Sequence, residues 1–280
     1  MTLEEKFKEL RKKNEKALIG FITAGYPTAE ETTKIADALI RGGVDILELG
    51  LPFSDPIADG ITIQRASESS LRAGMNTDLY FELAAGIKGV EKVCLTYYNL
   101  VLQRGLERFV NDCESAGISG LIVPDLPVEE SKPLLKICEG YETDLIFLIA
   151  PTTTEKRMAK ILDAASGFIY VVSLLGVTGA REKLSDTIRP LIGRIKEREL
   201  ARDRDVPLAV GFGISKQEHV RTVCEVADGA IVGSAFIRLI EEGLRSEENM
   251  LREVETFATS LKKETKIAGA CFPDSLRAQR

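Results

Sequence analysis

Two carboxylates, Glu48 and Asp59, stand on either side of a loop broken by proline and glycine, in the segment ELGLPFSDPIADG. Glu48 ends an apolar run in which period-two alternation places it on one face with Val44 and Ile46. A carboxyl at the end of a buried row loses hydration, which raises its pKa toward neutral pH. Asp59 lies in a polar loop, and we expect it to stay ionised. Two carboxyls with different pKa values can divide the roles of general acid and general base.

Each carboxylate also has an ordinary structural interpretation. A glutamate at a strand end is often a neutralised or ion-paired core residue, because perturbed carboxylates also serve structural networks. An Asp before Gly is common in Asx turns. Both interpretations stay open for Glu48 and Asp59 when the two residues are considered alone.

The elements that must position these carboxylates are eight short apolar runs rich in Val, Ile and Leu. The runs are continuous rather than alternating, which indicates strands covered on both faces, as in a parallel sheet. They begin at Ala17, Val44, Val93, Gly120, Asp144, Phe168, Pro207 and Gly229. Helical patterns separate them. Eight strands alternating with helices in 280 residues predict an α/β fold, a single eight-fold (βα) TIM barrel.

The ends of the chain and of its helices carry further signals. A first helix from Thr2 to Asn14, with Phe7 and Leu10 on its apolar side, is expected to close the bottom of the barrel. Residues 1–266 then form the catalytic domain, and residues 267–280, which lack periodicity, are expected to be a loosely ordered tail.

Two later helices begin with capping boxes. Thr28 with Glu31, and Ser215 with Glu218, match the pattern S/T-x-x-E. In this pattern the Ser or Thr side chain accepts the backbone N–H of the glutamate three residues later.

A phosphate site is predicted where the last three strands end. The connections after the second and sixth runs are the longest, and in a barrel such loops surround the active site. Gly211 and Gly213 end the seventh run, Gly233 and Ser234 end the eighth, and Gly179 closes the motif GVTG after the sixth. Glycines let backbone N–H groups approach an anion, and a helix N-terminus favours negative charge.

Four apolar side chains are candidates for the wall of a pocket that holds a flat ring. They are Phe21 in the first run, Tyr98 after the third, Leu126 after the fourth and Tyr170 in the sixth. A pocket with a phosphate site on one side, carboxylates on the other and aromatic walls between suits a phosphorylated sugar-like chain attached to an aromatic group.

Composition narrows the class of protein. A net charge of −6 argues against a nucleic-acid surface. Five widely spaced cysteines without a CxxC pair suit reduced thiols, and with no His cluster we expect no metal site. The one histidine, His219, lies on a helical pattern where we expect a solvated side chain. The chain shows neither a signal-peptide pattern nor a membrane-length apolar run, so we expect a cytoplasmic protein.

The motifs GFITAGYPT, ELGLPFSDPIADG, TYYN, PDLPVEES, GVTG, GFGIS and GSA, in this order between Ala17 and Arg238, resemble the tryptophan synthase alpha subunit family. The segment PFSDPIADG is the most specific of them. The resemblance implies cleavage of indole-3-glycerol phosphate to indole and glyceraldehyde 3-phosphate, a retro-aldol step without a cofactor in this chain.

The resemblance also implies roles for single residues. Glu48 would be the acid/base that protonates the ring carbon bearing the side chain, and Asp59 would hold the indole N–H. Tyr170 matches an active-site tyrosine and Phe21 a ring-packing phenylalanine. The phosphate-binding positions of the family match Gly179, Gly211, Gly213, Gly233 and Ser234. Some members carry an arginine shortly before GVTG, where this chain has Ser173-Leu174-Leu175.

The partner that the resemblance implies is a beta subunit, in an alpha-beta-beta-alpha complex, and pyridoxal phosphate is expected only in that subunit. The residues that match the partner-facing surface are Pro52, Asp55, Pro56, Asn99 and Arg104.

Three alternatives stay open. A related barrel enzyme acting on another phosphosugar would share the terminal glycines but use other acid/base residues than Glu48 and Asp59. A catalytically silent subunit that only activates a partner would not need that pair. A freestanding lyase that releases indole would share every motif.

Overall fold

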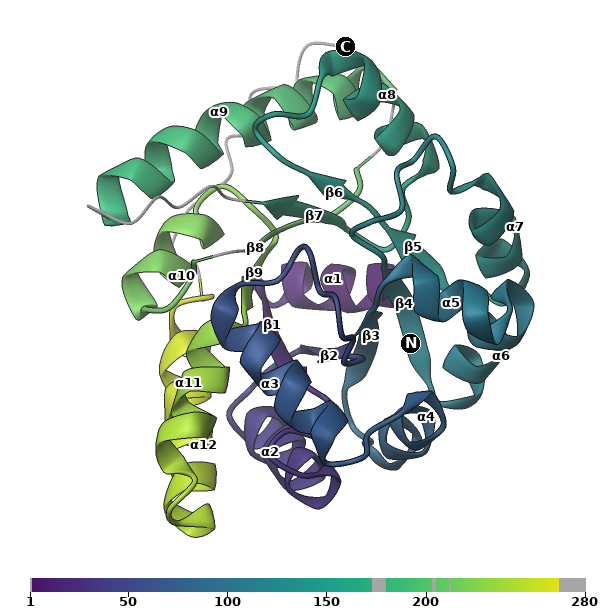
Figure 1. Ribbon diagram of the computed structural model, residues 1–280. Coiled ribbons are helices and arrows are strands. Elements are labelled where there is room, and N and C mark those ends of the chain that lie inside the picture. Colours follow the sequence, from purple (N-terminus) through teal and green to yellow (C-terminus); the bar gives the residue numbers. More distant parts are fainter. Residues whose placement is uncertain (1, 173–179, 203–204, 212, 267–280) are drawn as a thin grey trace.

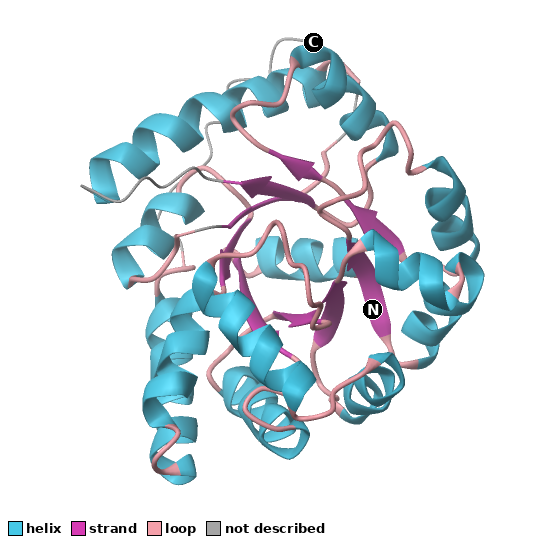
Figure 2. Cartoon of the chain, viewed as in Figure 1, coloured by secondary structure: helices cyan, strands magenta, loops and turns pink. Residues whose placement is uncertain are grey.

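The apolar runs form a barrel of parallel strands, surrounded by helices in the computed structural model (Figures 1 and 2). The structure describes residues 2–172, 180–202, 205–211 and 213–266, so the predicted tail of residues 267–280 lies outside the described part. The strands are β1 (Ala17–Thr23), β2 (Ile46–Gly50), β3 (Glu91–Leu95), β4 (Ile118–Ile122), β5 (Asp144–Ile146), β6 (Leu148–Ile149), β7 (Ile169–Val172), β8 (Leu208–Gly211) and β9 (Gly229–Val232).

The order of the strands is β5-β4-β3-β2-β1-β9-β8-β7-β6, and every neighbouring pair is parallel. The two outermost strands, β5 and β6, are separated in the chain only by Phe147. Together they occupy the place of the one strand predicted from Asp144, and the chain itself joins the two ends of the sheet. The prediction of an eight-fold TIM barrel is therefore confirmed, with its fifth strand split in two.

The helices cover the outside of the barrel because their apolar stripes pack on the outward side chains of the strands. They are α2 (Ala29–Arg41), α3 (Ile61–Arg72), α4 (Thr77–Gly86), α5 (Tyr98–Arg104), α6 (Leu106–Ser115), α7 (Lys132–Gly140), α8 (Glu155–Ala164), α9 (Ala180–Leu200), α10 (Gln217–Cys224), α11 (Ser234–Gly243) and α12 (Glu247–Lys263). The long connection after β2 holds both α3 and α4. Among the described helices, none is long and apolar enough to span a membrane.

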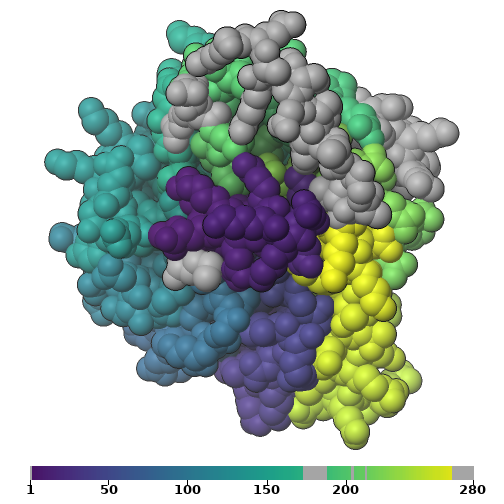
Figure 3. Space-filling view, turned by 180° about the vertical axis from the view of Figure 1, so that it is seen from behind, coloured from purple at the N-terminus to yellow at the C-terminus, as the bar shows by residue number. Residues whose placement is uncertain are grey.

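The first helix, α1 (Leu3–Lys12), closes the bottom of the barrel, as predicted. Leu3, Phe7 and Leu10 are buried against the inward side chains of the strands, and the ring of Phe7 lies 5.8 Å from that of Phe168. Figure 3, which views the molecule from behind, shows α1 in purple across this end. In the described part of the chain, α1 thus closes one end of the barrel and leaves the carboxyl ends of the strands open.

Of the two predicted capping boxes, one is present only as an N-cap and the other is wrong. Thr28 caps α2 and accepts the N–H of Glu31 at 3.2 Å. A cap at Ser215 requires a helix that begins at Lys216. The helix α10, however, begins at Gln217, and its N-cap is Lys216. The N–H of Ser215 instead donates to Nδ1 of His219 at 3.3 Å.

The prediction of a solvated His219 is also wrong, because this side chain is only 5% exposed. Burial lowers the pKa of His219, which leaves the imidazole neutral and able to accept that N–H at neutral pH. The side chain thus closes the turn between β8 and α10.

The described cysteines are buried free thiols, and they are Cys94, Cys113, Cys138 and Cys224. This agrees with the prediction of reduced, buried cysteines for the part of the chain that the structure describes.

Candidate active site

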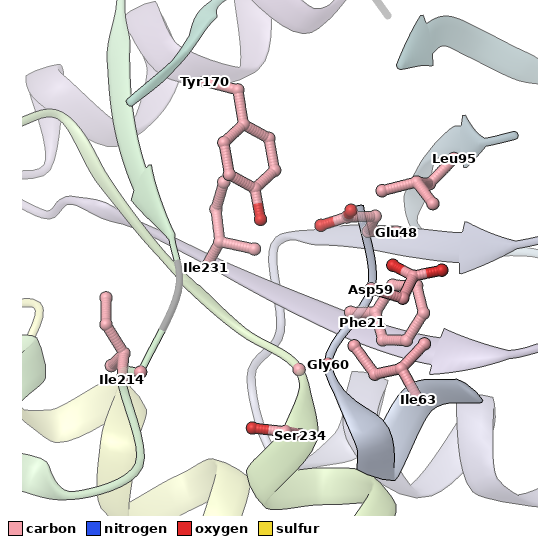
Figure 4. A pocket seen from close by; sticks show the side chains of 12 residues that line it. Phe21, Glu48, Asp59, Gly60, Ile63, Leu95, Tyr170, Ile214, Ile231 and Ser234 are labelled. Carbon is pink, nitrogen blue, oxygen red and sulfur yellow. The ribbon is translucent and has the colours of Figure 1, made fainter. Parts of the chain in front are cut away.

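A cavity of about 240 Å³ opens at the carboxyl ends of the strands (Figure 4). It is lined by side chains from β1, β2, β3, β7 and β9 and by the loops that follow β2, β8 and β9. The lining residues are Phe21, Glu48, Asp59, Gly60, Ile63, Leu95, Tyr170, Gly213, Ile214, Ile231, Gly233 and Ser234. This is the face on which TIM-barrel enzymes carry their active sites.

Glu48 is the most deeply buried ionisable group in this cavity, with 1% of its surface exposed. It points inward from β2, in register with Phe21 on β1 and Val93 on β3. Its Oε2 atom is buried and makes no hydrogen bond to the described residues. Burial, with a smaller contribution from the charge of Asp59, raises the pKa of Glu48 to about 8. Glu48 is therefore protonated at neutral pH and holds a proton beside the cavity.

Asp59 reaches the same cavity from the loop between β2 and α3. One oxygen of its carboxylate accepts a hydrogen bond from the hydroxyl of Tyr97 at 3.0 Å. Burial raises the pKa of Asp59 to about 6, and the hydrogen bond from Tyr97 opposes this shift. Asp59 does lie in a loop, but its own carboxyl is partly buried. At neutral pH it is still mainly ionised, so the two carboxyls differ in charge.

The aromatic wall differs in part from the prediction. Phe21 and Tyr170 line the cavity, and in Figure 4 the Tyr170 hydroxyl points to the side where Glu48 lies. Tyr98 and Leu126 are not among the lining residues. Because β3 ends at Leu95, Tyr98 already belongs to α5, and Leu126 packs in the core between barrel and helices. Aliphatic side chains complete the wall instead, namely Leu95, Ile63, Ile214 and Ile231.

Two glycines make room for the aromatic rings. A Cβ atom on Gly211 would clash with the hydroxyl oxygen of Tyr170, and one on Gly50 would lie 2.7 Å from the ring of Phe21. Gly211, predicted to bind phosphate, does not itself line the cavity. It shapes the site by leaving space for Tyr170. The role of Gly50 was not predicted from the sequence.

Three of the residues predicted to bind phosphate, Gly213, Gly233 and Ser234, line the cavity. Gly213 has φ +77°, a conformation that favours glycine, and it lines the same cavity as Gly233 and Ser234. Gly233 is the N-cap of α11, and no side chain there caps the first turn. Uncapped N–H groups and the helix dipole give the N-terminus of α11 an affinity for anions. Gly179 and Ser173-Leu174-Leu175 lie outside the described residues.

The residue that sequence reasoning missed is Tyr97, which contacts Asp59. The motif TYYN drew attention to the neighbouring Tyr98 instead. Only the end of β3 decides which of the two rings faces the loop, and strand ends are the least certain part of a sequence-based prediction.

The predicted partner-facing residues fall into two groups. Asp55 and Asn99 are exposed, and Pro56 is half-buried. Pro52 is buried within the chain itself, so its place on an open surface is a wrong expectation.

Arg104 also has internal contacts. Its guanidinium donates to Asp78 and Asp112 and lies 5.0 Å from the ring centre of Phe81, and 14% of its side chain is exposed. It binds α5 to α4 and α6, which leaves little of it for a partner.

The most exposed apolar side chains on this side of the molecule are Ile57 and Ile61, at 81% and 68%. They follow Asp55 in the loop that carries Asp59 and at the start of α3.

Comparison with known proteins gives one consistent result. A family model described as tryptophan synthase alpha chain matches residues 7–266. The tryptophan synthase alpha chain of Methanosarcina barkeri is 52% identical over 268 residues, which cover 95% of this chain and 98% of that protein. The alpha chain of Methanocaldococcus jannaschii is 48% identical, with 92% and 90% covered.

Solved structures agree with these relatives. A structure of Mycobacterium tuberculosis tryptophan synthase superposes with a TM-score of 0.85 at 35% identity, covering 95% of this chain and 98% of that chain. The tryptophan synthase subunit alpha of Legionella pneumophila gives a TM-score of 0.81 at 32% identity, with 95% and 98% covered.

Proposed function

Because this chain belongs to the tryptophan synthase alpha chain family, we infer that it is a lyase of tryptophan biosynthesis that cleaves indole-3-glycerol phosphate. The products are indole and glyceraldehyde 3-phosphate. The observation that carries the assignment of this reaction to the cavity is the carboxyl of Glu48, which is buried, protonated at neutral pH and placed beside an ionised Asp59.

The reaction requires two proton transfers and no oxidation. Glu48 donates its proton to the ring carbon that bears the side chain, and Asp59 stabilises the positive charge that develops at the indole N–H. The bond between that carbon and the side chain then breaks, and its electron pair restores the aromatic ring. The side-chain hydroxyl loses its proton as the aldehyde forms. Glu48, now a carboxylate, can accept this proton and return to its starting state.

The other walls of the cavity bind the rest of the substrate. Phe21, Leu95 and Tyr170 offer apolar surface to the indole ring. The phosphate lies at the start of α11, where Gly213, Gly233 and Ser234 line the cavity. The glycerol chain of the substrate spans the distance from Glu48 and Asp59 to the N-terminus of α11.

The chain itself needs no cofactor for these steps. A beta subunit with pyridoxal phosphate is the expected partner, in an alpha-beta-beta-alpha complex, and it would consume the indole. The exposed Asp55 and Ile57 support this proposal, because they lie in the same loop as Asp59.

The buried free thiols support a reducing, cytoplasmic location.

The test is indole release from indole-3-glycerol phosphate by the purified chain and by two variants, Glu48→Gln and Asp59→Asn. Each change removes a proton or a charge and hardly alters volume. We expect each to lower kcat by about 10²- to 10⁴-fold while the circular dichroism spectrum stays unchanged. A Glu48→Gln protein within a few-fold of the original rate would refute the role of Glu48.

A further inference from the structure

Tyr97 is a buried side chain directly behind the cavity, between β3 and α5, and only 2% of it is exposed. Its hydroxyl donates to Oδ2 of Asp59 at 3.0 Å and accepts the backbone N–H of Ala58 at 3.1 Å. One oxygen atom therefore binds two consecutive residues of the loop that follows β2. No motif-based assignment above gives Tyr97 a function.

The ring of Tyr97 binds the other end of the same loop. It stacks on Phe53, with ring centres 5.2 Å apart and an interplanar angle of 27°. The segment from Phe53 to Asp59 is thus held at its start by ring stacking and at its end by two hydrogen bonds. The exposed Ile57 lies between these two attachments.

The direction of the hydroxyl proton follows from these contacts. Since the N–H of Ala58 occupies a lone pair of the oxygen, the single proton is free to point at Asp59. Burial raises the pKa of Tyr97, so the hydroxyl keeps this proton at neutral pH. A donor fixed in this way favours the ionised form of the carboxylate over the neutral form.

We propose that Tyr97 is the positioning residue that aims the carboxylate of Asp59 into the cavity and keeps it charged. The inference rests on the function proposed for Asp59, but it concerns a residue that does not line the cavity. A tyrosine that merely supported the loop would stabilise the fold without affecting the titration of Asp59. The two roles therefore differ in what the hydroxyl alone does.

The experiment is the variant Tyr97→Phe, which keeps the ring and its stack on Phe53 and removes only the hydroxyl. We expect kcat/KM to fall by about 10- to 100-fold, because a hydrogen bond to a charged group is lost. The acid limb of the pH profile should move to higher pH. A ¹³C NMR titration of the Asp59 carboxyl, which needs no substrate, should show the same upward shift.

The matched control is Tyr98→Phe, one residue further along. The hydroxyl of Tyr98 makes no hydrogen bond to the described residues, and its ring does not line the cavity. This variant should leave both the rate and the titration of Asp59 unchanged. Thermal unfolding of both variants would show that each is folded.

The outcomes separate this inference from the proposed function. If the original protein releases indole and Asp59→Asn does not, an unmoved titration of Asp59 in Tyr97→Phe overturns the role of Tyr97 alone. A rate loss without any shift of the acid limb also overturns it, since loop support would then suffice. If the original protein releases no indole, the proposed function fails, while the NMR titration still decides whether Tyr97 sets the charge of Asp59.

Discussion

Glu48 and Asp59 share one cavity, and burial raises both of their pKa values, by different amounts. The difference follows from their neighbours. Asp59 has a hydrogen-bond donor in Tyr97, whereas Oε2 of Glu48 has no partner among the described residues. A protonated acid and a charged carboxylate therefore coexist at neutral pH, which is the condition that the proposed reaction requires.

The pH dependence of kcat/KM should be bell-shaped. Activity requires ionised Asp59, so it is lost as the pH falls through about 6, and it requires protonated Glu48, so it is lost as the pH rises through about 8. Because the two carboxyls interact, the two limbs belong to the pair. Both limbs would be measured from initial rates of indole release between pH 5 and 9, at substrate concentrations below about one tenth of KM. A flat profile over this range would contradict the assignment.

The buried carboxyl of Glu48 should also cost stability. Its pKa is about 8 in the folded protein against 4.5 when exposed, so the folded state binds more protons and stability falls as the pH rises from 4.5 through 8. Glu48→Gln should remove this penalty, on the order of 3 kcal/mol at pH 7. Unfolding by urea at pH 4, 7 and 8 would measure how much the free energy of unfolding of Glu48→Gln exceeds that of the original protein. This difference should vanish at pH 4. The exposed Glu139→Gln is the control, and equal effects of the two changes would sink the prediction.

The sequence was sufficient to find the two carboxylates but not the group that adjusts them. Alternation along β2 placed Glu48 on the inward face, because a strand has only two faces. The orientation of Tyr97 depends on where β3 ends and on how the loop from Phe53 to Asp59 folds back. That information lies in tertiary contacts, which a single sequence does not display.

Among the elements, α11 carries the chemistry of the anion site. Its first turn faces the cavity without a side-chain cap, and Gly233 leaves the backbone open there. A cap of the usual kind would fill the position that a phosphate needs. The absence of a capping side chain is thus part of the site.

A negative charge at this position should exclude phosphate. Ser234→Asp places a carboxylate at the start of α11, where it would interact with the helix dipole and repel the ligand. We expect KM for indole-3-glycerol phosphate to rise at least about tenfold and inhibition by inorganic phosphate to disappear. Ser246→Asp, at the N-cap of α12, makes the same change of charge elsewhere and should alter neither value. Unchanged inhibition by phosphate in Ser234→Asp would place the anion at another site.

Strands were easier to predict than helix ends and connections. Each predicted apolar run corresponds to a described strand because parallel strands are buried on both faces and tolerate few polar residues. The break at Phe147 has no signal of its own within the continuous run DLIFLIA. The cap at Ser215 failed because a buried His219 satisfied the backbone instead, which local propensity does not reveal.

At the scale of the whole molecule, the loop after β2 links the cavity to the surface. It carries Asp59 at the cavity and exposes Ile57 to solvent, with Ile61 at the start of α3 beside it. A partner that covers these side chains would restrict the loop and with it the carboxylate. By linkage, substrate that favours the same loop conformation would strengthen the binding of the partner.

Activation by a beta subunit should therefore depend on this loop. Ile57→Asp puts a charge in the proposed interface, and we expect it to lower activation by a saturating cognate beta subunit at least about fivefold while the basal rate changes less. Leu200→Asp is the control, because Leu200 is also exposed but ends α9, at the opposite end of the barrel. Equal turnover with and without the beta subunit would favour a freestanding lyase.

The closure of the barrel by α1 has a consequence for folding during synthesis. This helix is synthesised before every strand of the barrel, yet its apolar side chains Leu3, Phe7 and Leu10 pack against strands that are made much later, including the one that begins beside Phe168. Until then the nascent chain carries an amphipathic helix without a binding surface, which chaperones can recognise. Docking of α1 becomes possible only when most of the barrel has emerged, so this helix is made before the strands but reaches its native position after them.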